Sequence, residues 1–152
     1  MWRYRSITII FSLLLMGLTT TSTNNLPLKL EDTLPSSIVL TFVPTDDATV
    51  RASNPTANLG ANPSVEVDVD PRKDALLRFN VSGIGGASVT KVTLRLYAID
   101  SSPSGGNFSV VTNTSWNEGA VTWQNASPGD GVALGSLGPV SAGNWYELDV
   151  TP

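Results

Sequence analysis

The chain has 152 residues, 13 acidic and 9 basic side chains, a formal net charge of −4, and no His or Cys. This length suits one ordinary domain. Without imidazoles or thiols, Ser-His-Asp triads, Cys-His dyads, disulfides and zinc sites built on His or Cys are excluded. The negative charge counts against nucleic-acid binding, which needs a basic face. A binding or structural module remains, or an enzyme that works through carboxylates alone.

The first residues have the pattern of a secretory signal peptide. Arg3 and Arg5 precede an apolar run from Ile7 to Leu18, and a polar tract follows over 19–25. The apolar run is about a dozen residues, whereas a membrane-spanning helix needs roughly 20. We therefore expect residues 1–23 to be removed on export, with no membrane span afterwards. The mature protein is then secreted or held at the cell surface.

The next segment, residues 24–40, reads as a linker. Pro27 and Pro35 leave room for barely two helical turns between them, and the charges show no sustained period. A folded unit is expected to begin at residue 41.

Beyond the linker the hydrophobic pattern has period two, which is typical of β-strands with one buried face. Residues 64–70 alternate valines with polar residues, and 91–99 place four apolar residues on one face. Two further inward sets are Leu77, Phe79 and Val81, and Tyr146, Leu148 and Val150. Short Gly-, Pro- and Asn-rich segments separate these runs as turns. The pattern predicts an all-β fold, an antiparallel β-sandwich over 41–152.

Several sequence blocks together resemble the DNRLRE-type module, carbohydrate-binding module family 96. These blocks are 45–50 (TDDATV), 58–60 (NLG), 75–79 (ALLRF), 89–97 (VTKVTLRLY), 115–118 (SWNE), 121–123 (VTW) and 145–150 (WYELDV). The resemblance implies a jelly-roll sandwich in an exported protein, and binding of acidic polysaccharide, alginate in particular. It also implies attachment to other domains of a larger exported protein.

One departure from the family concerns the C-terminal end. Modules of this family continue past the block that 145–150 resembles, with strands that complete both sheets. The resemblance therefore implies a sandwich that is incomplete within this sequence. Either the product is truncated or a partner supplies the remaining strands.

Aromatic rings that stack on sugar C–H surfaces are the first candidate binding groups. Tyr97, Trp116 and Trp145 are the expected platforms, because Trp116 lies in a polar loop and Trp145 has outward parity on its strand. Trp123 is expected in the core. For each ring the alternative is simple core packing.

Two arginines are candidates for binding a uronate carboxylate, because a guanidinium binds a carboxylate through two parallel hydrogen bonds. Arg78 and Arg95 both lie opposite the apolar parity of their strands, and they share a face if those strands are neighbours in one sheet. The alternative is cross-strand pairing with Glu66, Asp68, Glu147 or Asp149.

Asp46, Asp47 and Asn58 offer hard oxygen ligands near the start of the sandwich. Calcium takes six to eight such ligands. A structural calcium would stabilise an exported domain without disulfides, although no EF-hand spacing is present. The alternative is a set of solvated loop residues.

Catalysis would need a carboxylate pair, as in glycoside hydrolases. Glu118, Glu147 and Asp149 are available, and Glu147 and Asp149 lie two residues apart on one strand face. Any strand with a polar face produces this spacing, however. We expect a non-catalytic module that holds a polysaccharide. The alternative function is a structural spacer or surface-adhesion domain with no glycan site.

Overall fold

The computed structural model describes residues 4–14, 37–126 and 129–151, with 4–14 and 37 as backbone. These residues form β-strands and turns without a helix, and every strand pairing is antiparallel. The all-β, sandwich-like prediction is therefore confirmed. In this part of the chain no helix has the length and apolar character that crossing a membrane requires.

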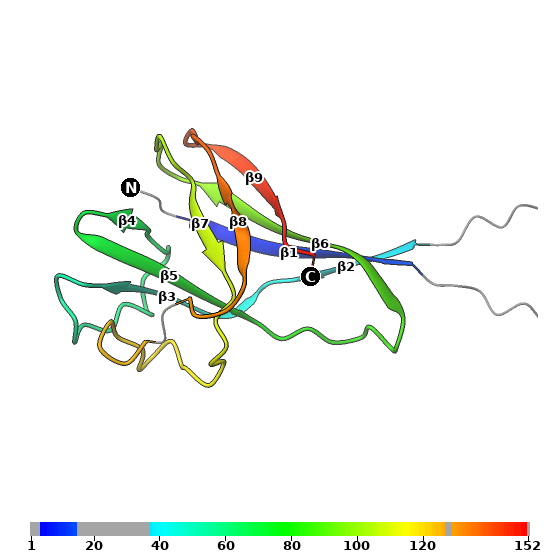
Figure 1. Cartoon of the computed structure of the whole chain (residues 1–152), viewed down its shortest axis with the longest axis horizontal. Coiled ribbons are helices and arrows are strands. Elements are labelled where there is room, and N and C mark those ends of the chain that lie inside the picture. Colours follow the sequence, from blue (N-terminus) through cyan, green and yellow to red (C-terminus); the bar gives the residue numbers. More distant parts are fainter. Residues whose placement is uncertain (1–3, 15–36, 127–128, 152) are drawn as a thin grey trace, which may run out of the picture.

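The strands form three sheets (Figure 1). The first has the order β2-β1-β6-β9, the second β3-β5-β4 and the third β7-β8. Their bounds are β1 Tyr4–Leu14, β2 Ser37–Phe42, β3 Pro44–Arg51, β4 Asp68–Val69, β5 Arg72–Phe79, β6 Ser88–Ala98, β7 Gly106–Ser109, β8 Ala133–Leu137 and β9 Asn144–Asp149.

The main core lies between the first sheet and the inner side chains of the other two. Its buried members include Leu94, Leu96 and Ala98 of β6, and Leu96 is only 1% exposed. The inward residues of β5, β7, β8 and β9 pack against them, among them Leu77, Phe79, Phe108, Leu137, Tyr146 and Leu148. The period-two pattern of 91–99 and the inward set Tyr146, Leu148 and Val150 thus identified the core-side face correctly, although Thr93 on the other face of β6 is also buried.

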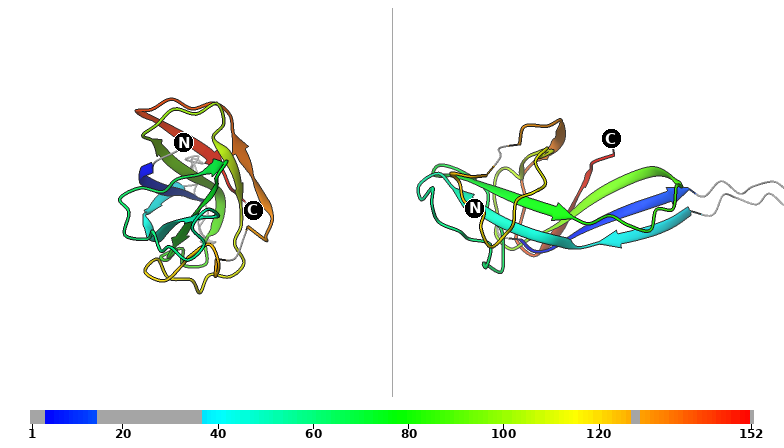
Figure 2. Two further views of the ribbon diagram at one scale, coloured as in Figure 1. Left: turned by 90° about the vertical axis from the view of Figure 1, so that its left-hand side faces the viewer. Right: turned by 90° about the horizontal axis from the view of Figure 1, so that it is seen from below.

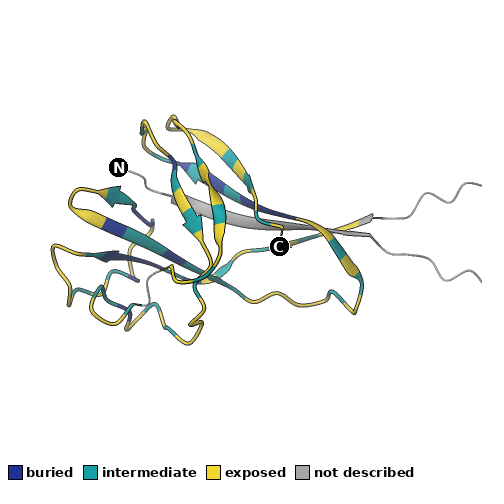
Figure 3. Cartoon of the chain, in the orientation of Figure 1, coloured by how far each residue is buried: buried dark blue, intermediate teal, exposed yellow. Residues whose placement is uncertain are grey.

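A second core covers the opposite face of the β3–β5 sheet. Ala48, Val50 and Leu76 pack there under the segment 111–126, which we call the anchored loop. Val121 of this loop is buried, and its two tryptophans are half-buried against the same cluster. Both faces of this sheet are therefore packed, and the buried bands of β3 and β5 are visible in Figure 3. A β5 side chain that alternates away from the main core is therefore not exposed to water on that ground alone.

The segment 64–70 departs from its predicted alternation. Only Asp68–Val69 is a strand; Val65 is buried, but Val69 is 92% exposed. Glu66, predicted to face outward, is buried, and its Oε2 atom lies 3.0 Å from Lys73 Nζ and 3.0 Å from Arg51 NH2. The two cations compensate for the loss of water around this carboxylate, so the valine alternation alone does not define the buried face here.

The first two strands fall in ranges that the sequence predicts as leader and linker. Strand β2 begins at Ser37, inside the range 24–40 predicted as a linker, and the division of the chain at residue 41 stays a prediction. The apolar run of the predicted leader contributes β1, which lies between β2 and β6. Removal of residues 1–23 on export stays a prediction.

Candidate functional site

The outer face of β6 and β9 brings four of the chemically distinctive side chains together. In the antiparallel register Arg95 stands opposite Glu147, and Tyr97 stands opposite Trp145. Directly opposed residues share a face, and the alternate positions, Leu94 and Leu96 among them, belong to the main core. We call Arg95, Tyr97, Trp145 and Glu147 the aromatic face.

The aromatic face is compact and open to solvent. The Tyr97 and Trp145 ring centroids are 5.1 Å apart with an interplanar angle of 56°. Arg95 Cζ lies 4.5 Å from the centroid of the Trp145 ring, which is cation–π contact distance. Trp145 remains 41% exposed although it is a large apolar side chain. The result is an exposed indole flanked by a second ring and by a guanidinium.

The guanidinium of Arg95 keeps most of its donors available. Its Nε atom lies 3.5 Å from Glu147 Oε1, a weak ion pair, and makes no hydrogen bond. Within the part of the chain that the structure describes, no group accepts a hydrogen bond from its two terminal nitrogens. The side chains of Arg95 and Glu147 are 39% and 58% exposed. A ligand carboxylate can therefore reach Arg95 while Glu147 moves into water.

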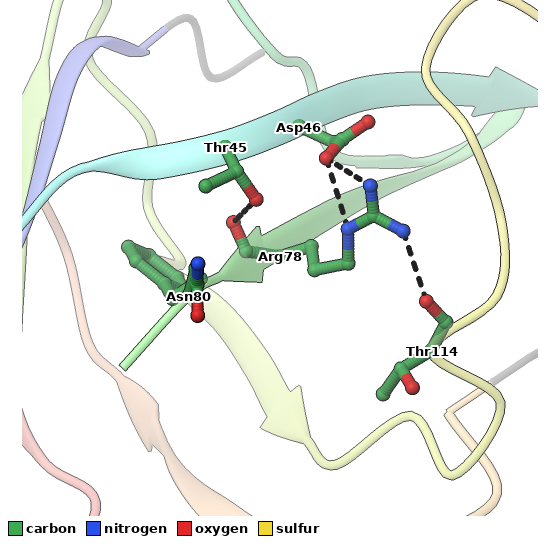
Figure 4. A pocket seen from close by; sticks show the side chains of 6 residues that line it. Thr45, Asp46, Arg78, Asn80 and Thr114 are labelled. Atoms are coloured by element: carbon green, nitrogen blue, oxygen red, sulfur yellow. Dashed lines mark hydrogen bonds and ion pairs between the residues drawn. The ribbon is translucent and has the colours of Figure 1, made fainter. Parts of the chain in front are cut away.

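Arg78, the other predicted uronate ligand, is occupied by the protein (Figure 4). Its Nε and NH2 both donate to Asp46 Oδ2, and its NH1 donates to the carbonyls of Thr114 at 3.0 Å and Trp116 at 2.7 Å. The Trp116 ring lies 5.5 Å from Arg78 Cζ and packs on the second core. Arg78 and Trp116 thus fasten the anchored loop to the β3–β5 sheet.

A hollow of about 510 Å³ lies beside this anchor (Figure 4). Arg78 spans it, and Thr45 Oγ1 donates to the Arg78 carbonyl at 3.3 Å. Its lining residues are Thr45, Asp46, Arg78, Phe79, Asn80 and Thr114. The strongest donor of this hollow, the Arg78 guanidinium, is committed to internal acceptors, so the hollow is a weaker candidate than the aromatic face.

The condition under which Arg78 and Arg95 would share a face, that their strands are neighbours in one sheet, is not met. Arg78 is on β5 in the β3-β5-β4 sheet, whereas Arg95 is on β6 in the β2-β1-β6-β9 sheet. The segment after Phe79 crosses from one sheet to the other, and the anchored loop covers the Arg78 side. The alternative of cross-strand pairing holds for both arginines, with Asp46 as the partner of Arg78 in place of the four acids considered.

A third arginine–tryptophan contact, between Arg72 and Trp123, could not be predicted from the sequence pattern. Arg72 Cζ lies 5.5 Å from the Trp123 ring, and its Nε and NH2 donate to Asp74 at 3.2 and 3.0 Å. Trp123 is half-buried against the second core, as expected for a core residue. Asp74 satisfies the guanidinium, so this pair is a natural control for the aromatic face.

The residues predicted to bind calcium have roles in holding the anchored loop. Asn58 Nδ2 donates to the carbonyls of Glu118 at 2.6 Å and Val121 at 2.8 Å. The Asp47 N–H donates to Glu118 Oε2 at 3.2 Å. Burial opposes ionisation of Asp46, but hydrogen bonds from Arg78 and the Glu118 N–H outweigh it and hold the Asp46 pKa below its usual value.

The same cluster affects Asp47 in the opposite direction. Burial, followed by the negative charges of Glu118 and Asp46, raises the pKa of Asp47. Among the described residues no group of three or more acidic, His or Cys side chains is arranged to hold a metal ion. Asp46 and Asn58 already have protein partners, so the geometry adds no support for a calcium site beyond the sequence pattern. The calcium site stays a prediction.

The fold and the aromatic face together define a class: a β-sandwich binding module with a solvent-exposed aromatic platform. The comparison with family models agrees with this class. The model of carbohydrate-binding module family 96 matches residues 39–152, and the chain belongs to that family. No curated protein and no solved structure gives a significant match.

Proposed function

We propose that this chain is a non-catalytic module that binds an extracellular, uronic-acid-containing polysaccharide through the aromatic face. The observation that carries the proposal is the pairing of an exposed indole, Trp145, with a guanidinium, Arg95, whose terminal nitrogens have no acceptor in the described part of the chain. Family membership supports carbohydrate as the ligand class. The leader-like residues 1–23 support action outside the cell.

The chemistry of the face fits a charged sugar. An indole offers a flat apolar surface to the C–H face of a pyranose ring, and a tilted neighbour such as Tyr97 limits where that ring can lie. The Arg95 guanidinium, beside the stacking surface, offers parallel N–H donors to a uronate carboxylate. Because the chain has a net charge of −4, general attraction to a polyanion is absent. Specific pairing at Arg95 therefore has to supply the selectivity.

Asp149, a carboxylate at the end of β9, does not suit the role of general acid in hydrolysis. A glycosidase needs one carboxyl with a raised pKa as general acid. Hydrogen bonds from the Thr151 hydroxyl at 2.6 Å and the Thr151 N–H at 3.0 Å hold the pKa of Asp149 below its usual value. Glu118 lies in the anchored loop, which packs on the β3–β5 sheet, and accepts the Asp47 N–H. This supports binding without catalysis.

The test compares Trp145→Ala, Arg95→Ala and the control Arg72→Ala by affinity electrophoresis in gels with alginate or with a neutral β-glucan. We expect Trp145→Ala to weaken binding to both polymers and Arg95→Ala to weaken binding to alginate by about tenfold or more, equal to about 1.4 kcal/mol. Arg72→Ala removes an arginine over a tryptophan away from the face, so it retains binding. Circular dichroism confirms that each variant is folded.

The alternative, a spacer or adhesion domain with no glycan site, gives a different result. Folded wild-type protein then shows no retardation in either gel, and Trp145→Ala and Arg95→Ala migrate like wild type. Either finding rejects the proposed site. Loss of binding in Arg72→Ala alone also rejects the proposed site, because that result would place the binding site at Arg72 and Trp123, beside the second core.

A further inference from the structure

The position of β1 inside the first sheet is a distinct feature of this fold. β1 pairs with β2 over Ile9–Leu14 and with β6 over Tyr4–Leu14. Figure 2 shows it running between these two strands along their length. The backbone of β1 therefore pairs with the facing edges of both neighbouring strands. We call the position between β2 and β6 the acceptor slot.

The register of β1 against β6 shows which positions of a strand in this slot lie on the core side of the sheet. Ile7, Ile9 and Phe11 stand directly opposite three β6 residues, Leu96, Leu94 and Val92, which are 1%, 7% and 8% exposed. Opposed residues share a face, so these three positions lie on the core side of the sheet. The other side carries a mixed set: Thr8 opposite Arg95, Ile10 opposite Thr93 and Ser12 opposite Lys91.

The strand that fills the slot also belongs to the signal peptide that is predicted to be cleaved on export. Residues 4–14 fall within the signal peptide predicted from the two arginines and the apolar run of 7–18. Removal would leave two edges of one sheet with unpaired N–H and C=O groups beside the apolar residues of β6. Unpaired backbone next to a core is costly, and open edges recruit other strands.

We propose that the acceptor slot of the processed protein is a docking site for a β-strand of a partner polypeptide. The strand runs antiparallel to β6 and carries apolar residues at three alternate positions on the core side, as β1 does with Ile7, Ile9 and Phe11. β1 shows that a strand of this chemistry fits the slot and completes both ladders. The mode of binding is β-strand addition, with main-chain hydrogen bonds giving affinity and the alternate side chains giving selectivity. The proposal rests on removal of the leader and is independent of the glycan site.

The experiment begins with the full chain expressed in a bacterium that exports it. The intact mass of the product outside the cytoplasm shows whether residues 1–23 are gone. The processed protein is then mixed with a peptide of residues 4–14 (YRSITIIFSLL), and thermal unfolding is followed by circular dichroism. A matched peptide carries Ile7→Ser, Ile9→Ser and Phe11→Ser, which keeps its length and backbone but removes the three core-side groups.

We expect the leader to be absent and the native peptide to raise the unfolding temperature, or to induce β-structure if the processed protein is poorly folded alone. The serine peptide does neither. The full chain made in the cytoplasm with its leader intact gives no response, because β1 already fills its slot. A retained leader in the exported product overturns the proposal, since β1 is then a permanent strand. So does equal behaviour of the two peptides, including no effect of either.

Discussion

Arg78 donates both Nε and NH2 to a single oxygen of Asp46, and this pairing commits its guanidinium to contacts within the protein. Three arginines of the described chain lie over tryptophan rings, at 5.5, 5.5 and 4.5 Å. Arg72 and Arg78 each donate two hydrogen bonds to a carboxylate, whereas Arg95 approaches Glu147 only to 3.5 Å. The same contact thus occurs with a carboxylate-bound guanidinium at Arg72 and Arg78, and without one at Arg95, the arginine of the proposed glycan site.

Arg78→Met tests the anchoring role. The substitution keeps an apolar stem but removes every donor to Asp46 and to the carbonyls of Thr114 and Trp116. We expect the melting temperature to fall by several degrees, with faster amide exchange confined to the anchored loop and unchanged glycan affinity. Arg72→Met is the control, because Arg72 is 60% exposed and its partner is on its own strand. Loss of glycan binding by a folded Arg78→Met protein would contradict this assignment.

Asp47 gives the anchored loop a dependence on pH. Its pKa is raised from 3.8 by burial and by the charges of Glu118 and Asp46, so the folded state holds this proton more tightly than the unfolded state. The contribution of Asp47 to stability therefore falls as pH rises from below 3.8 through its raised value. Asp47→Asn should melt at a higher temperature than wild type at pH 7.

The difference between Asp47→Asn and wild type should vanish at pH 3, where the carboxyl is protonated in both states. Asp46 and Asp149 have lowered pKa values, so their stabilising contribution is present above about 3.8 and is lost in acid in both proteins. Melting curves at pH 3, 5 and 7 separate the two effects. A variant that is less stable than wild type at pH 7 shows that Asp47 has a stabilising partner instead.

Glu147→Gln should strengthen binding of an acidic glycan. Glu147 is the protein's own carboxylate beside Arg95, and it competes with a uronate for the guanidinium. Exposed ion pairs contribute about 0–1 kcal/mol, so the variant should fold normally. Titration with an alginate oligomer should show a several-fold gain in affinity. A neutral oligomer should bind as before, and an equal gain for both ligands would point to reduced overall charge as the cause.

The sequence predicted the strands best where one face alone is buried. The alternation of 91–99 and of 145–150 marked the core residues of β6 and β9, and outward parity marked Arg95 and Trp145. The contact between these two side chains could not be predicted, because it depends on which strands become neighbours. Alternation within one strand carries no information about its partner.

The sequence pattern predicts least where a residue far away in the chain covers or neutralises a position on a strand face. Arg78 has outward parity as predicted, yet the anchored loop, which has no hydrophobic period, packs over that face. Glu66 is buried because Lys73 and Arg51 neutralise it, and no local pattern shows such a compensation. In both cases a non-local partner decided the environment of the residue.

Gly60 tests how closely the anchored loop approaches the 58–60 turn. A Cβ atom at Gly60 would lie 2.0 Å from the Glu118 carbonyl oxygen, which is backbone and cannot move aside alone. Gly60→Ala should therefore lower the free energy of unfolding by about 1–3 kcal/mol or more. Gly138→Ala is the control, because nothing lies within 4 Å of its Cβ position. Equal stability of the two variants in urea unfolding would show that the loop is not held against this turn.

The buried ion pair of Glu66 and Lys73 allows a test by single and double substitution. Both residues are less than 9% exposed, and Lys73 Nζ lies 3.0 Å from Glu66 Oε2. Lys73→Met removes one of the two cations that the described residues place beside Glu66 and should cost about 3–5 kcal/mol, the usual effect of breaking such a pair. Adding Glu66→Leu should restore most of this loss, because an apolar pair needs no compensation and Arg51, 31% exposed, can reach water. Urea unfolding of the three proteins measures the coupling, and a double variant no more stable than Lys73→Met would show that the cost lies in packing and not in charge.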